Sequence, residues 1–216
     1  FTLKSTPEAK IFWHRDVEDN SVAVATFKTP TQQLLIESEL IIQHYNESPL
    51  NFIVSDYAIN YPFKYLANDN FILSSYMVLP NEETRTLLNN WIYNVYKYNE
   101  TIQTYTLLQK LTTYIFKNFT YKVREEAGVQ TAKQTLSYGS GSCRDFAFLF
   151  MEVVKCLGLA TRFVSGYLYA PLMSDKVGST HAWAEVYLPG GGWIGFDPTT
   201  GNIAGTDHIS VAVSRL

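Results

Sequence analysis

The amino-acid sequence predicts an α+β protein, in which helices pack on an antiparallel sheet after a β-rich N-terminal region. Three observations predict this class. β-Branched residues dominate two early segments, residues 21–27 and 33–42. Apolar residues then recur at helical spacing from about residue 80. Finally, two segments of strand character meet at a glycine-rich turn, residues 189–192.

The composition indicates a packed protein and argues against two kinds of partner. The chain has 216 residues, of which 46% are hydrophobic and 15% aromatic, which suits one large domain or two small ones. The net charge is −3, and Lys and Arg are neither in excess nor clustered, so we expect no nucleic-acid partner. No apolar run reaches the ~18 residues that a membrane span needs, so we expect no membrane partner. The oligomeric state is left open.

The two cysteines, Cys143 and Cys156, do not suit a disulfide bond. If both lie on one helix, their Cα atoms are roughly 20 Å apart. A disulfide requires Cα atoms within about 7 Å of each other. We therefore expect two reduced thiols, which favours a cytoplasmic location.

Residues 1–79 are expected to consist mostly of strands. Asp19-Asn20 and Pro30-Thr31 supply turns around the β-branched segments. Nothing in this region indicates chemistry, and its charged residues fit the solvated face of a sheet. Because the pattern changes near Pro80, we divide the chain into a β-rich region, residues 1–79, and a core, residues 80–216.

The core begins with helices and ends with strands. Asn81 precedes Glu82 and Glu83, a typical helix start with acidic residues in the first turn. The apolar residues that follow at helical spacing are Leu87, Leu88, Trp91, Val95 and Tyr98. Later segments are predicted as helices at residues 104–119 and 143–157, and as strands at residues 162–168, 181–188 and 193–197.

Cys143 lies where a Gly/Ser run meets a dense apolar segment. At the first turn of a helix, unpaired N–H groups and the helix dipole favour a thiolate and can bind a developing oxyanion. The small residues Gly141 and Ser142 leave room for a substrate above the sulfur. The alternative is that Cys143 is a small buried hydrophobic residue, as free cysteines often are. Cys156, in the middle of the same apolar helix, is expected to belong to the core.

The predicted hairpin, residues 181–197, can bring a histidine and a carboxylate together. If Tyr187 pairs with Trp193, Asp197 lies opposite Trp183 and diagonal to His181 on the same face. A shift of one residue in register would move Asp197 to the other face. The register is therefore a sharp prediction.

A thiol at a helix start, a histidine at the start of one strand and an acid at the end of the next are the parts of a Cys-His-Asp triad. A single histidine such as His181 is more often a structural residue than a catalyst. A single Asp-Pro pair such as Asp197-Pro198 is more often part of a turn than of an active site. Metal binding is a poor alternative, because the sequence has no Cys-x-x-Cys or His-Glu-x-x-His motif. His14, His44 and His208 share no pattern and are expected at the surface.

Three segments resemble the bacterial transglutaminase-like family, a branch of the papain-like cysteine enzymes. They are Gly141–Tyr167 around the cysteine, His181–Tyr187 around the histidine, and Gly192–Thr199 around the aspartate. The resemblance implies a papain/transglutaminase-like core, and residues 1–79 resemble the β-rich region that precedes the core in this branch. The tail, Asp207–Arg215, resembles a family strand that normally continues further, so we expect truncation at both ends.

The resemblance also implies roles for individual residues. Cys143 attacks an amide carbonyl, His181 takes and returns the proton, and Asp197 orients the imidazole. The backbone N–H of Cys143 serves as one oxyanion donor, and Gln134 or Tyr138 is a candidate for the second.

Each of three further residues has two alternative places in this scheme. Asp145 either supports the site from behind or faces solvent at the helix start. Trp183 and Trp193 either form walls of a substrate groove or pack within the hairpin.

Three functions fit this pattern. The first is a hydrolase, an amidase or cysteine protease that acts on a protein or peptide substrate. The second is a transglutaminase that transfers the acyl group to an amine. The third is a non-catalytic binding scaffold, which the complete set of three residues argues against. We expect no cofactor and no metal, since no acidic loop of the calcium-binding type is present.

Overall fold

The computed structural model describes residues 1–43, 45, 48–98, 100–169 and 179–215. The chain divides into two compact units, Phe1–Glu47 and Ser48–Leu216. This division falls earlier than the predicted boundary near residue 80, because residues 48–79 group with the helices and the sheet that follow them.

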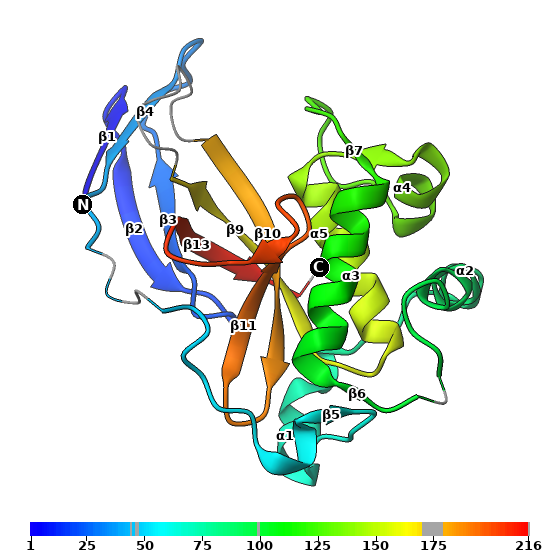
Figure 1. Ribbon diagram of the computed structural model, residues 1–216. Coiled ribbons are helices and arrows are strands. Elements are labelled where there is room, and N and C mark those ends of the chain that lie inside the picture. Colours follow the sequence, from blue (N-terminus) through cyan, green and yellow to red (C-terminus); the bar gives the residue numbers. More distant parts are fainter. Residues whose placement is uncertain (44, 46–47, 99, 170–178, 216) are drawn as a thin grey trace. The chain divides into compact units, whose positions relative to one another are not determined.

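The unit Phe1–Glu47 contains two antiparallel pairs of strands (Figure 1). The strands are β1 (Thr2–Thr6), β2 (Lys10–Arg15), β3 (Ser21–Thr26) and β4 (Leu35–Glu39). β1 pairs with β4, and β2 pairs with β3. The strands predicted within residues 21–27 and 33–42 are therefore confirmed. Every described residue of this unit is at least partly exposed, so the described part contains no buried core of its own.

The segment that opens the second unit is mostly helical turns and loops. Its elements are η1 (Asp56–Ala58), β5 (Asn60–Tyr61), α1 (Ala67–Leu73) and η2 (Ser74–Tyr76). The expectation that strands dominate up to residue 79 is wrong here. The aromatic residues of this segment give it a composition typical of strands. In the structure, individual aromatic side chains instead form separate contacts with the core. The Tyr61 hydroxyl donates to the Leu157 carbonyl at 2.9 Å, and the Tyr65 hydroxyl donates to the Tyr187 carbonyl at 2.8 Å.

Four further α-helices are described after this segment. They are α2 (Glu82–Ile92), α3 (Thr104–Asn118), α4 (Ala132–Tyr138) and α5 (Cys143–Cys156). The helix predicted to start after Asn81 and the helices predicted at residues 104–119 and 143–157 are confirmed. Asn81 is the N-cap of α2, since its side chain accepts a hydrogen bond from Thr84 N–H. Helix α4 was not expected. Two-residue strands connect the helices, namely β6 (Ile102–Gln103), β7 (Thr120–Tyr121) and β8 (Ser140–Gly141).

The five-stranded sheet of the second unit has the order β12-β11-β10-β9-β13, and all its neighbouring strands are antiparallel. The strands are β9 (Thr161–Leu168), β10 (Ser179–Leu188), β11 (Gly192–Asp197), β12 (Asn202–Ile203) and β13 (His208–Ser214). Tyr187 pairs with Trp193, as predicted. Gly190 in the hairpin turn has φ +85°, a left-handed conformation that favours glycine.

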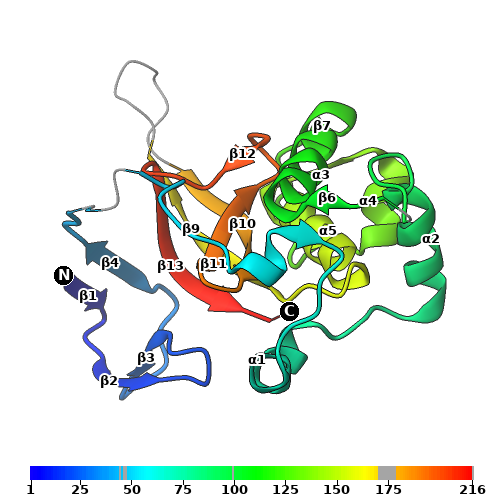
Figure 2. The same cartoon turned by 60° about the horizontal axis from the view of Figure 1, so that its bottom comes forward.

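Helix α5 lies at the centre of the second unit, between the other helices and the sheet (Figures 1 and 2). Phe146, Leu149 and Phe150 of α5 are fully buried. Phe150 stacks on Phe196 of β11 with ring centroids 5.8 Å apart. Burying this much apolar surface fixes α5, and with it the position of Cys143 relative to the sheet.

No helix among the described residues combines the length and the apolar character needed to cross a bilayer.

Candidate active site

Cys143 is the first residue of α5 and is partly buried. Its N–H and those of the next residues have no helical carbonyl one turn earlier, so this end of the helix concentrates donors and positive dipole. The packing of the rest of α5 against the sheet holds the thiol in place. The Cys143 thiol is therefore held at the end of the helix where these donors lie.

His181 and Asp197 form a buried pair. His181 Nε2 lies 2.8 Å from Asp197 Oδ2, and the two residues are 7% and 0% exposed. Ala184 pairs with Phe196 in the β10–β11 ladder. Continuing this register by one residue places Asp197 opposite Trp183 and diagonal to His181. The predicted register thus brings the carboxylate and the imidazole together.

The environment of His181 favours its protonated form. Burial opposes protonation, but hydrogen bonds to Asp197 and Cys143, together with the charges of both groups, raise the pKa of His181 to about 9. Because Nε2 is bonded to Asp197, Nδ1 is the nitrogen left for the Cys143 thiol. The arrangement can support a thiolate beside an imidazolium.

Asp197 is held ionised by several donors. Its Oδ1 accepts from Thr199 N–H at 2.8 Å, and its Oδ2 accepts from the Thr200 hydroxyl at 3.0 Å. Burial alone would raise the pKa of this carboxyl, but bonds from His181, His208 and Thr199 lower it well below its usual range. The carboxylate therefore stays charged and fixed in orientation.

His208 also contacts Asp197, which corrects the expectation that it lies at the surface. Its Nε2 is 3.1 Å from Asp197 Oδ2, and its side chain is largely buried. One ligand atom from each of His181, Asp197 and His208 lies within 4.8 Å of the others. Hydrogen bonding accounts for this cluster, and the expectation of no metal stays a prediction. His208 is the first residue of β13, and no local pattern in the sequence distinguishes it from a surface histidine.

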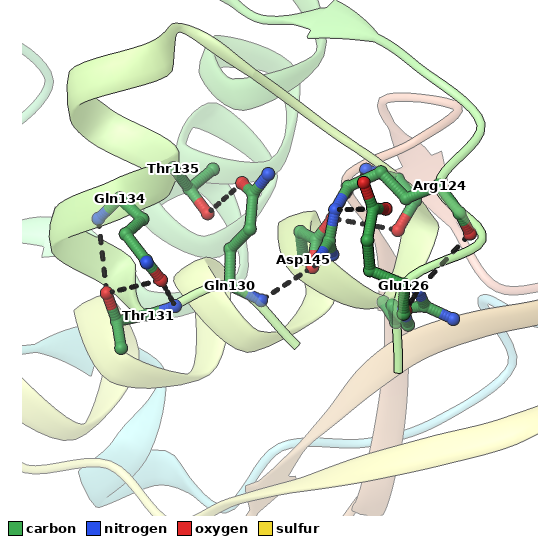
Figure 3. A network of polar contacts seen from close by, with 9 residues as sticks. Arg124, Glu126, Gln130, Thr131, Gln134, Thr135 and Asp145 are labelled. Atoms are coloured by element: carbon green, nitrogen blue, oxygen red, sulfur yellow. Dashed lines mark hydrogen bonds and ion pairs between the residues drawn. The ribbon is translucent and has the colours of Figure 1, made fainter. Parts of the chain in front are cut away.

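Asp145 anchors the start of α5 from behind (Figure 3). It is fully buried, and Arg124 Nη1 donates to both of its oxygens at 2.6 and 2.8 Å. The N–H groups of Gln130 and Ser142 each donate at 2.8 Å. Burial raises the pKa of Asp145, but these bonds outweigh it and lower the pKa below its ordinary value. Of the two predicted places for Asp145, the structure therefore shows the supporting one.

Residues 96–198 match the family model of the transglutaminase-like superfamily. The chain carries a transglutaminase-like core. The matched range includes Cys143, His181 and Asp197.

Curated bacterial relatives align with parts of this chain. The uncharacterised protein Mb2599c of Mycobacterium bovis is 32% identical over 118 residues, which cover 50% of this chain and 38% of the relative. The uncharacterised protein ML0607 of Mycobacterium leprae is 40% identical over 80 residues, which cover 35% of this chain and 28% of the relative. The chain thus spans less than half the length of either relative.

Solved structures resemble this chain to different extents. A candidate cysteine protease from Cytophaga hutchinsonii is 20% identical with a TM-score of 0.66, and the match covers 99% of this chain and 69% of that one. The periplasmic domain of TgpA from Pseudomonas aeruginosa is 23% identical with a TM-score of 0.47, over 62% of this chain and 48% of that one. The first match agrees with the α+β architecture and the strand-rich N-terminal region.

Gly141 and Ser142 pack against Asp145 at the start of α5. Both are buried. A Cβ on Gly141 would lie 2.8 Å from the Asp145 Cβ, so only glycine permits this close approach. The Ser142 hydroxyl donates to Asp145 at 2.8 Å. The expected room for a substrate above the Cys143 sulfur stays a prediction.

The two candidates for a second oxyanion donor lie on α4. Gln134 is exposed, and its carbonyl oxygen accepts from Thr131 N–H at 2.9 Å, so it caps its own helix (Figure 3). Tyr138 is 62% exposed. No described hydrogen bond joins either residue to Cys143, and their proposed role stays a prediction.

Tyr121 is a neighbour of Cys143 that sequence reasoning missed. It pairs with Gly141 in the short β7–β8 ladder, two residues before the cysteine. Burial and the charge of Cys143 raise the pKa of the Tyr121 hydroxyl. No local pattern could have found it, because the contact depends on a parallel pairing of two-residue strands.

The two tryptophans lie on neighbouring strands of the sheet, Trp183 on β10 and Trp193 on β11. Trp183 is 2% exposed and stacks on His181 with ring centroids 6.2 Å apart. Trp193 lies at the hairpin end, beside Tyr187 and Tyr76. Six residues of extended strand, roughly 20 Å, separate Tyr187 from His181. The packing alternative accounts for both residues.

Proposed function

We propose that the transglutaminase-like core catalyses thiol-dependent acyl transfer on amide or peptide bonds, with hydrolysis as the reaction. The observation that carries this proposal is the buried His181–Asp197 pair, with Cys143 at the start of α5 among the groups that raise the pKa of His181. Each group has the environment that its role requires. The name of the Cytophaga hutchinsonii neighbour suggests the same class.

In this scheme, His181 holds the thiol proton while the Cys143 sulfur attacks the substrate carbonyl. The C–N bond breaks as the imidazolium passes its proton to the leaving amine, which leaves a thioester on Cys143. A water molecule then loses a proton to His181 and attacks the thioester. The carboxylic acid is released, and the thiol recovers its proton. Asp197 keeps the ring oriented and stabilises its charge.

The Cys143 N–H supports the developing oxyanion from the start of α5. A substrate carbonyl held at this end of the helix also experiences the positive dipole. Protein or peptide amides fit this chemistry, and we propose them as substrates. We propose neither a nucleic-acid partner nor a bound cofactor.

The first experiment is the pH dependence of Cys143 alkylation by iodoacetamide, followed on the intact chain by peptide mass spectrometry. Cys156 is the internal control, because burial raises its pKa to about 11. We expect Cys143 to react well below pH 8, with the reaction lost or shifted in His181→Ala. An ordinary thiol profile for Cys143, unchanged in His181→Ala, would refute the proposed nucleophile and favour a binding scaffold.

A second experiment separates hydrolysis from transamidation, which use the same three residues. A glutamine-containing peptide library is incubated with the protein, with and without a labelled primary amine, and Cys143→Ala is the control. Hydrolysis releases acid or cleaved peptide irrespective of the amine. Incorporation of the amine in place of hydrolysis would identify a transglutaminase.

The cellular location stays a prediction. The cytoplasmic expectation rests on the two reduced thiols alone. Fractionation of cells that express the native gene would decide the point.

A further inference from the structure

One oxygen of Asp197 accepts hydrogen bonds from two imidazole rings. His181 Nε2 lies 2.8 Å from Oδ2, and His208 Nε2 lies 3.1 Å from the same atom. The two rings come from different strands, β10 and β13, with centroids 5.9 Å apart. A Cys-His-Asp triad needs only one of these imidazoles, so the second requires an explanation.

The proton of His208 has a defined place. Gly205 N–H donates to His208 Nδ1 at 3.1 Å, so Nδ1 is the acceptor and the ring proton lies on Nε2. His208 is therefore a hydrogen-bond donor to Asp197. The Trp183 ring meets His208 edge to face at 5.1 Å and stacks on His181, which fixes both rings in position.

A hydrogen bond from His208 stabilises the negative charge of the Asp197 carboxylate. The carboxylate then stabilises a positive charge on its second partner, His181, less strongly. Among the described residues, the titratable groups that contact His181 are Cys143 from α5, Asp197 from β11 and His208 from β13. Of these, His208 acts on His181 chiefly through the shared Oδ2.

We propose that His208 is a positioning residue that shares the Asp197 carboxylate with His181 and limits how tightly His181 holds its proton. This inference rests on the proposed role of His181 as the base. An imidazolium that is held too strongly protonates a leaving amine poorly, because an efficient general acid has a pKa near the working pH. His208 would thus keep His181 able both to accept and to release the proton.

The test is a proton NMR titration of the His181 Cε1–H resonance, assigned by its absence in His181→Ala. All titrated proteins carry Cys143→Ala, which removes the coupled thiol titration. His208→Phe keeps the ring and its packing on Trp183 but removes the donor. His208→Gln is the matched control, since its amide can place an N–H near the former Nε2. Amide fingerprint spectra establish that each variant is folded.

We expect His208→Phe to raise the titration midpoint of His181 by about one pH unit, and His208→Gln to leave it close to the reference. If His208→Phe does not fold, His208→Asn replaces it. Asn can accept from Gly205 N–H but is too short to donate to Asp197, so the same increase is expected. An unchanged or lowered midpoint with either of these variants, or an equal increase in His208→Gln, would overturn the inference.

Failure of this inference can be distinguished from failure of the proposed function. The titration uses neither substrate nor thiol, whereas the alkylation profile depends on Cys143. Suppose that Cys143 is alkylated well below pH 8, as expected, but the titration midpoint of His181 is unchanged in His208→Phe. The proposed function would then stand, and the proposed role of His208 would be wrong.

Discussion

At the scale of single residues, the raised pKa of His181 makes stability depend on pH. The folded state holds the His181 proton up to about pH 9, whereas an unfolded histidine loses it near pH 6.5. This contribution to stability is complete below pH 6.5 and is lost as the pH rises through 9. In contrast, the contribution of Asp197, whose pKa is lowered, is present across this range and is lost only in acid.

We therefore predict that the wild-type protein loses stability relative to His181→Gln between pH 6 and pH 10, by at least ~1 kcal/mol. The Gln amide can still donate to Asp197 but does not titrate. Urea unfolding of both proteins at several pH values measures the difference, in which contributions from shared groups largely cancel. Parallel pH curves for the two proteins would contradict a raised pKa of His181.

Residue type and strand register were enough to predict where His181 and Asp197 meet. The alternation in β10 and the fixed turn leave one register that buries the apolar face, and that register puts both residues on the other face. His208 could not be predicted in this way. Its strand pairs with β9 across a register shift between Ser210 and Ala212, which local sequence does not encode.

At the scale of elements, the start of α5 depends on a buried charge. Asp145→Asn keeps the shape of the side chain but removes the charge opposite Arg124, which is itself only 16% exposed. We predict a loss of about 3–5 kcal/mol in the free energy of unfolding, because breaking a buried pair leaves an uncompensated charge. Urea denaturation monitored by tryptophan fluorescence gives this value.

The matched control is the exposed ion pair between Lys133 and Glu83. Lys133→Met should change stability far less, since salt bridges in water are weak. If Asp145→Asn were no more destabilising than Lys133→Met, the network around Asp145 would not be what fixes the helix start.

Helix α5 was predictable because residues 146–154 are apolar at every position except Glu152, which gives a dense apolar segment long enough for a helix. Helix α4 was not, because its seven residues are too few to show a helical period. Its signals are instead at its ends, where Thr131 and Gln134 form a capping box and Gly139 adopts φ +59°. The Asp145 network was also hidden, since Arg124 and Gln130 reach it from a loop without periodicity.

At the scale of the whole molecule, the composition did not show how unevenly the core is distributed. The large core cluster begins at Tyr61 and includes residues from α2, α3, α5 and the sheet. The β-branched segments of Phe1–Glu47 look equally apolar in the sequence, yet none of the described residues there is buried. Alternation predicts a strand, but only tertiary packing determines what covers it.

This distribution predicts a gradient of hydrogen exchange along the chain. Amides of α5 should exchange slowest, because their opening requires disruption of the central core. Amides of β2 and β3 should exchange much faster, since two-stranded pairs with exposed side chains have little burial to oppose opening. Hydrogen–deuterium exchange with peptide mass spectrometry measures both regions in one sample.

Helix α2, which buries only Leu88 and Ile92, provides an intermediate reference. Protection of β2 and β3 equal to that of α5 would show that these strands are buried in solution, by a second copy of the chain or another molecule.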